Sequence, residues 1–81
     1  MIGPNQEAIL LAVTKYALPS KYLLRDKLHF SEQQLNESIE GLKKKKLVGT
    51  RILSSKYRIS VVFPTPEGID YLRRRFNYEG S

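Results

Sequence analysis

The 81-residue sequence contains no cysteine, a single histidine and no long apolar run. The lack of cysteine excludes a disulfide scaffold, a cysteine-based zinc site and a thiol nucleophile. No apolar stretch approaches the roughly 18 residues that a membrane-spanning helix requires, so we expect no membrane partner. No charged and apolar leader precedes a small-residue cleavage site, and we therefore expect a cytoplasmic protein.

Side chains suited to catalysis are equally scarce. His29 has no partner in the sequence that would make it a metal ligand or a general base, and we interpret it as a turn residue. The carboxylates Glu32, Glu37 and Glu40 are most simply exposed helix formers, with Glu40 placed to pair with Lys44. No Gly-rich phosphate loop, nucleophile elbow or Walker sequence occurs. We therefore expect neither an enzyme nor a cofactor or metal site.

Positive charge is in excess and is unevenly distributed. The formal net charge is +6, and residues 43–58 contain seven basic side chains and no acidic one. These are Lys43, Lys44, Lys45, Lys46, Arg51, Lys56 and Arg58. A local basic patch is typical of a protein that binds a polyanion such as nucleic acid, although many such patches are only solvated surface. The lysine run also suits the carboxyl end of a helix, where the helix dipole favours cations.

Three helices are predicted in the first half of the chain. Residues 5–17 carry apolar side chains at three- and four-residue steps, which indicates a helix with one buried face. A short second helix is expected over residues 20–28, with a serine cap. The third helix begins at a capping box formed by Ser31 and Gln34. Because only His29 and Phe30 separate the second helix from this cap, the two helices must cross steeply, as in a helix-turn-helix.

After residue 47 the period of the apolar pattern changes from 3.6 to 2, which predicts a β-hairpin. Neither Ser54 nor Ser55 favours a tight turn, so we expect a four-residue loop closed by Ile52 and Tyr57. The facing pairs in that register are Thr50 with Ile59, Val48 with Val61, and Arg51 with Arg58. Like charges directly opposite each other destabilise a sheet, whereas a phosphate between the two arginines would reverse the effect.

A last helix follows the hairpin. Thr65 is expected to cap it, Pro66 to take its first position, and Ile69, Leu72 and Phe76 to form its buried face. The predicted fold class is α+β, a winged helix-turn-helix in the order helix, helix, helix, strand, strand, helix. We expect a single domain over residues 1–81, frayed after residue 76. Its parts are the turn and recognition helix at about 20–46, the wing at about 47–63 and the final helix at about 65–76.

Two stretches carry a resemblance to known families. SEQQLNESIEGLKKKKLV, residues 31–48, is similar to the recognition helix and first wing strand of the MarR-like and PadR-like families of small prokaryotic or viral regulators. TPEGIDYL, residues 65–72, resembles the segment that follows their wing and opens their final helix. Together with the preceding helix pair, the resemblance covers nearly the whole chain. It implies the winged helix-turn-helix fold and a role as a DNA-binding regulator.

We therefore predict a double-stranded DNA-binding protein, a transcriptional regulator with its third helix in the major groove and its basic wing on the backbone. The amides of Gln33, Gln34 and Asn36 suit bidentate contacts with adenine, and the first turn of this helix is the part that reaches base edges. The expected DNA-binding residues are Lys21, Ser31, Gln33, Gln34, Asn36, Lys43, Lys44, Arg51, Lys56 and Arg58.

The exposed stripe of the third helix departs from the family pattern. It consists of Gln33, Glu37, Glu40 and Lys44, where many relatives carry basic side chains, and phosphates would repel the two carboxylates. An alternative is therefore a winged-helix protein-interaction module that uses this acidic and polar face, because one fold can serve both functions.

A single recognition helix contacts only a few base pairs, whereas two copies of the chain can bind a palindrome. We therefore expect a homodimer, formed through the terminal helices. Tyr71 and Tyr78 lie seven residues apart, away from the expected core face of the last helix, and aromatic side chains are enriched at interfaces. So short a chain shows no evident ligand pocket, and we expect no small-molecule effector.

Overall fold

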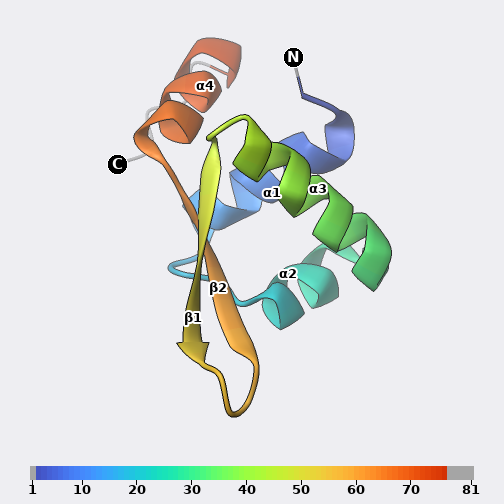
Figure 1. Cartoon of the computed structure of the whole chain (residues 1–81). Coiled ribbons are helices and arrows are strands. Elements are labelled where there is room, and N and C mark those ends of the chain that lie inside the picture. The colour runs from blue at the N-terminus through green and yellow to red at the C-terminus, as the bar shows by residue number, and fades with distance from the viewer. Residues whose placement is uncertain (1, 77–81) are drawn as a thin grey trace.

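The computed structural model of the protein describes residues 2–76. The elements are α1 (Pro4–Lys15), α2 (Lys21–Leu28), α3 (Glu32–Lys44), β1 (Val48–Ser54), β2 (Ile59–Pro64) and α4 (Pro66–Phe76), as labelled in Figure 1. This order confirms the predicted α+β winged helix-turn-helix arrangement. The segment expected to fray, residues 77–81 with Tyr78, lies outside the described residues.

The two helices of the helix-turn-helix begin at serine caps. The Ser20 Oγ accepts a hydrogen bond from the Leu23 N–H at 3.1 Å. At α3 the predicted capping box is present: the Ser31 Oγ accepts from the Gln34 N–H, and the Gln34 Oε1 accepts from the Ser31 N–H, both at 3.1 Å. Between them, His29 ends α2 in the left-handed region with φ 57°, which confirms it as a turn residue.

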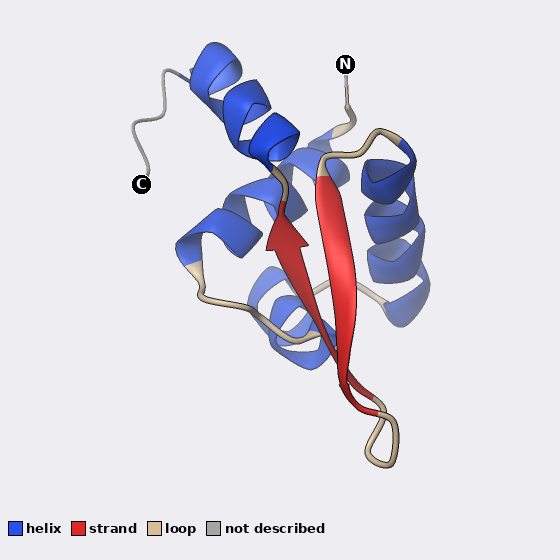
Figure 2. Cartoon of the chain, turned by 60° about the vertical axis from the view of Figure 1, so that its left-hand side comes forward, coloured by secondary structure: helices blue, strands red, loops and turns tan. Residues whose placement is uncertain are grey.

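The hydrophobic core draws on every element. Its most buried side chains are Ile9 and Leu10 of α1, Leu24 of α2, Leu35, Ile39 and Leu42 of α3, Val62 of β2 and Leu72 of α4. Figure 2 shows the helices gathered around one end of the hairpin, while its tip extends beyond them. No helix within residues 2–76 is long and apolar enough to cross a membrane.

The hairpin has the predicted loop length but not the predicted register. Its four-residue loop, residues 55–58, is closed by Ser54 and Ile59. Val48 faces Pro64, three residues beyond the predicted partner. Because side chains alternate between the two faces of a strand, an odd displacement moves those of β2 to the opposite face. Val62 therefore packs in the same core cluster as Val48, while Val61 is buried as well but lies outside that cluster.

The predicted pairing of two arginines is also wrong. Arg51 faces Val61, and Arg58 lies in the loop with φ 53°. The loop lies two residues later in the chain than predicted, and an irregularity at Leu53, between the paired residues Ile52 and Ser54, makes the displacement of the partner strand odd. The two arginines therefore do not form a repelling pair across the sheet.

A short segment before α2 fixes that helix beside the wing. The Val62 N–H donates to the Pro19 carbonyl at 2.9 Å, and Ser20 forms an isolated bridge to Val61. The segment thus pairs with the edge of β2 at an isolated bridge, outside the two-stranded sheet. Because Lys21 follows Ser20 directly, the first turn of α2 is held next to the hairpin.

One predicted core residue of α4 is exposed. Phe76 is 42% exposed because it lies at the end of α4, one turn beyond the buried Leu72. Its ring lies 5.2 Å from the guanidinium carbon of Arg75. Ile69 is half-buried, so of the three predicted core positions only Leu72 is fully buried.

Candidate nucleic-acid interface

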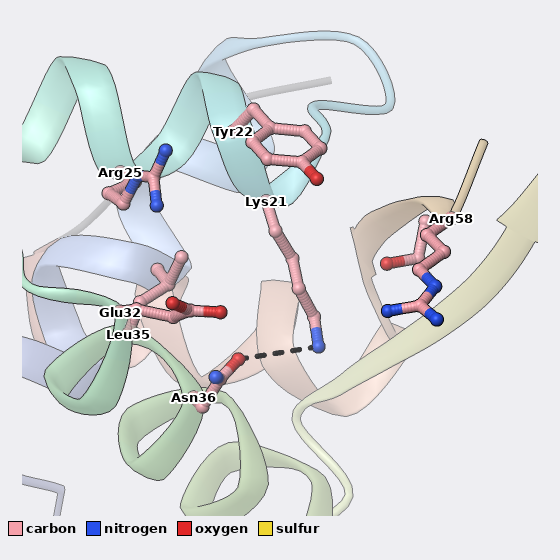
Figure 3. Close-up of a pocket in the computed structure, with 8 residues that line it drawn as sticks. Lys21, Tyr22, Arg25, Glu32, Leu35, Asn36 and Arg58 are labelled. Atoms are coloured by element: carbon pink, nitrogen blue, oxygen red, sulfur yellow. Dashed lines mark hydrogen bonds between the residues drawn. The ribbon is translucent and has the colours of Figure 1, made fainter.

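Three of the predicted DNA-binding residues line one open pocket. Lys21 comes from the start of α2, Asn36 from α3 and Arg58 from the loop of the wing. The pocket has a volume of about 290 Å³. Figure 3 shows Lys21 extended toward Asn36, with the Arg58 guanidinium turned toward them from the other side. Residues far apart in the sequence thus form one polar, cationic surface.

A hydrogen bond connects the two helices inside this pocket. The Lys21 Nζ donates to the Asn36 Oδ1 at 3.5 Å, and both side chains are partly buried. The bond positions the Asn36 side chain and holds the lysine ammonium at the junction of α2, α3 and the wing. Since the ammonium group has two further N–H donors, it can still bind an anion from solvent.

The pocket contains a further cation that the sequence did not predict as a DNA-binding residue. Arg25 lies one turn after Lys21 on the same face of α2, and its guanidinium carbon is 5.6 Å from the centre of the Tyr22 ring. The i, i+4 spacing of Lys21 and Arg25 was the signal that could have identified this arginine. With Arg58 the pocket lining has three cations, and Glu32 is its only carboxylate. The local charge is therefore positive.

The polar side chains at the start of α3 are bonded within the protein. Gln34 and Ser31 form the capping box, and the Gln33 Nε2 donates to the Glu37 Oε1 at 2.9 Å. Gln33, Gln34 and Glu37 are nevertheless exposed, so their remaining polar atoms face solvent. The first turns of α3 therefore present a rigid set of donors and acceptors.

At the other end of α3 lies the lysine run. Glu40 pairs with Lys43 at 3.6 Å, and not with Lys44 as predicted. In Figure 1 the carboxyl end of α3 lies near the start of β1, whereas the wing tip lies at the far end of the hairpin. The basic window of the sequence is thus divided in space between these two places.

The remaining cations of the wing are exposed. Arg51 lies in the middle of β1, and its side chain makes no hydrogen bond or ion pair with any described residue. Lys56 lies in the loop, with its Nζ 5.5 Å from the centre of the Tyr57 ring. Tyr57 is itself 66% exposed and Ile52 70% exposed, so the wing tip carries apolar as well as basic side chains.

The surface predicted for dimerisation differs from the expectation. Tyr71 is half-buried against the core, and its hydroxyl donates to the Glu7 Oε2 at 3.3 Å, joining α4 to α1. Arg75 pairs with the same carboxylate at 3.6 Å. Tyr71 thus contributes to packing within the domain. The exposed apolar side chains of the terminal helices are instead Leu11 of α1 and Phe76 of α4.

Within residues 2–76 no group of three or more His, Asp and Glu side chains is placed to bind a metal ion. In sequence, the chain matches no protein-family model and no curated protein. Its structure, in contrast, is similar to solved structures.

The transcriptional regulator BldR from Sulfolobus solfataricus superposes with a TM-score of 0.78 at 26% identity, over 90% of this chain and 52% of BldR. S. aureus MepR, solved in complex with DNA, gives a TM-score of 0.81 at 16% identity, over 90% of this chain and 60% of MepR. ZitR from Lactococcus lactis, described as a zinc-responsive MarR family member, gives a TM-score of 0.78 at 16% identity, over 86% of this chain and 48% of ZitR.

The chain therefore spans about half of the length of these neighbours. The likeness extends from α1 to α4 and includes the wing, in the element order predicted from the sequence. In its fold, the chain is a winged helix-turn-helix domain of the kind that MarR-family transcriptional regulators contain.

Proposed function

We propose that the protein binds double-stranded DNA and acts as a transcriptional regulator. The observation that carries this proposal is the convergence of Lys21, Arg25 and Arg58, from three elements, on one pocket beside the start of α3. A phosphate group fits such a site because several cations can surround it without a change in the fold. The DNA-bound MepR neighbour supports the same assignment, since it shares this fold.

In this arrangement α3 lies in the major groove and the wing follows the adjacent backbone. Gln33 and Asn36 approach base edges or nearby phosphates, while Ser31 and Gln34 also maintain the cap of α3. Lys44 lies on the same exposed stripe as Gln33, about 16 Å along the helix, and therefore approaches the backbone across the groove. The expected phosphate contacts are made by Lys21, Arg25, Lys43, Lys44, Arg51, Lys56 and Arg58.

The pocket cations can be tested one at a time by fluorescence anisotropy with a mixed-sequence duplex. Lys21→Ala and Arg58→Ala should each weaken binding by a similar factor for every sequence and lower the salt slope by about 1. Arg73→Ala is the matched control, because Arg73 is an exposed cation of α4 far from the pocket in sequence and fold. Equal effects of all three substitutions would contradict the proposed surface.

The protein also acts as a homodimer through its terminal helices in this proposal. One recognition helix contacts only a few base pairs, and two copies related by a two-fold axis can bind a palindrome about one helical turn apart. Leu11 and Phe76 are the exposed apolar side chains that α1 and α4 offer to a second copy.

Light scattering at tens of micromolar protein tests the dimer, with and without duplex. The expected protein mass, after subtraction of any bound duplex, is twice the 9.4 kDa of one chain, and the double substitution Leu11→Ala with Phe76→Ala should shift it toward one chain. A mass of one chain in both conditions would refute the dimer while leaving DNA binding by a single domain unaffected.

A further inference from the structure

The three amides at the start of α3 are not equivalent, because each has one end fixed by a bond inside the protein. The partner determines which end is occupied. A backbone N–H and a lysine ammonium only donate, so the Gln34 Oε1 and the Asn36 Oδ1 must be the accepting atoms. A carboxylate only accepts, so the atom of Gln33 that faces Glu37 must be its Nε2.

These bonds determine what each side chain can offer to DNA. In Gln34 and Asn36 the carbonyl oxygen already accepts one bond inside the protein, which leaves it a single lone pair, whereas their N–H groups remain available to the outside. Gln33 retains its Oε1 as an acceptor and the second hydrogen of its Nε2 as a donor. Adenine presents an N6 donor next to an N7 acceptor in the major groove, and an amide recognises it only with both of its ends. Of the three amides, Gln33 is the one whose carbonyl oxygen carries no bond inside the protein, so it can offer both ends without sharing its acceptor.

We infer that Gln33 is the adenine-recognising residue of α3 and that Glu37 is a positioning residue that fixes the orientation of its amide. This inference rests on the proposed DNA-binding function. The bond of 2.9 Å between them places both side chains on the exposed stripe of α3, one turn apart. The Glu37 carboxylate, which opposes the approach of this helix to phosphates, thereby acquires a function. It orients the glutamine and at the same time weakens binding to arbitrary sequences, because it repels phosphates.

Asn36 has a different function in the same arrangement. Its remaining N–H groups lie in the pocket with Lys21 and Arg58, next to the expected phosphate position. N–H donors suit phosphate oxygens, which accept hydrogen bonds whatever the DNA sequence. Asn36 therefore contributes to affinity, and Gln33 to the choice of base.

The experiment begins with selection of a preferred site from random duplex by the wild-type protein. Relative affinities are then measured for every single-base change in that site. We expect one position at which adenine is favoured by roughly 5- to 150-fold, the range for a good bidentate contact. Replacing that adenine with 7-deazaadenine, which lacks the N7 acceptor, should remove most of the preference. Gln33→Ala should remove the preference at this position and at no other.

Glu37→Gln provides the sharper variant, because it keeps the size of the side chain. A glutamine at this place can donate or accept, so the orientation of Gln33 is no longer fixed. In the Glu37→Gln variant, the preference for adenine at the position assigned to Gln33 should fall, while binding to all duplexes should become stronger. Glu40→Gln is the matched control: it removes a carboxylate from the same stripe, but Glu40 pairs with Lys43 and not with Gln33. It should strengthen binding to all duplexes without changing base preference.

Two results would overturn the inference. Retention of the adenine preference in Gln33→Ala, or loss of it in Glu40→Gln to the same degree as in Glu37→Gln, would assign base choice elsewhere. Either result can be obtained only if the wild-type protein binds duplex DNA. Each would therefore overturn this inference and leave the proposed function intact. Failure of the wild type to bind any duplex would overturn the proposed function and this inference together.

Discussion

The Thr65 hydroxyl donates a hydrogen bond of 2.7 Å to the carbonyl oxygen of Lys46, a residue 19 positions earlier in the chain. The same hydroxyl oxygen accepts from the Gly68 N–H at 3.1 Å, and the Thr65 N–H donates to the Leu47 carbonyl at 3.1 Å. The start of α4 is thereby joined to the end of α3, which fixes where the wing leaves and rejoins the helices.

Thr65→Ala should therefore destabilise the protein by about 1–2 kcal/mol, because both bonds of the hydroxyl are lost. Thr65→Ser keeps the hydroxyl and should restore most of the free energy of unfolding. Urea denaturation followed by circular dichroism measures both. Equal losses for the two variants would show that the methyl group of Thr65, and not its hydroxyl, carries the stabilisation.

Gly68→Ala should destabilise the protein although alanine favours a helix. A Cβ at position 68 would meet the Leu47 carbonyl oxygen, a backbone atom, and also approach the Leu10 side chain. We expect the free energy of unfolding to fall by about 2–3 kcal/mol. If helix propensity were the only effect, it would instead rise by up to about 1 kcal/mol. Glu67→Ala, one residue earlier and exposed, should change the stability by less than about 0.5 kcal/mol. A more stable Gly68→Ala variant would contradict the close approach of α4 to residue 47.

Arg58 should show opposite effects on stability and on binding. Its φ of 53° lies in the left-handed region, which is unfavourable for a side chain with a Cβ. Arg58→Gly should raise the free energy of unfolding by about 0.5–1 kcal/mol while lowering affinity for duplex DNA. Arg58→Ala should lower the affinity equally without the gain in stability. An unchanged affinity in both variants would remove Arg58 from the proposed interface.

The helices could be predicted from the sequence because their signals are local. The spacing of Leu35, Ile39 and Leu42 defines the buried face of α3, and the Ser31 capping box defines its start. The left-handed turn at His29 also follows from neighbouring residues, since a two-residue connection leaves few conformations.

The register of the wing could not be predicted in the same way. The apolar pattern of β2 does not mark a single buried face, because Val61 and Val62 are both buried, so the loop conformation chooses among the possible registers. That choice depends on the irregularity at Leu53 and on the positive φ of Arg58, neither of which has a glycine or asparagine to mark it. The predicted pair of Arg51 with Arg58 was wrong for this reason.

The pocket depends on tertiary contacts, which explains why only part of it was predicted. Lys21 and Arg58 were identified from charge, but their proximity follows from the contact between Pro19 and Val62. Arg25 was missed because only Lys21, at the start of α2, was assigned to DNA, and the i, i+4 spacing that places Arg25 on the same face was not used. The exposure of Phe76 and the burial of Tyr71 likewise depend on how α4 lies against α1, which the sequence period of α4 does not determine.

The dependence of duplex affinity on salt concentration tests the central claim most directly. The expected phosphate contacts with no ion-pair partner among the described residues are those of Lys21, Arg25, Lys44, Arg51, Lys56 and Arg58. Six such contacts predict that log K for a mixed-sequence duplex falls with log salt at a slope of about −5 per bound chain. The double substitution Lys21→Ala with Arg58→Ala should reduce the slope to about −3.5. No binding at low salt, or a slope near zero, would contradict the assignment of this surface to DNA.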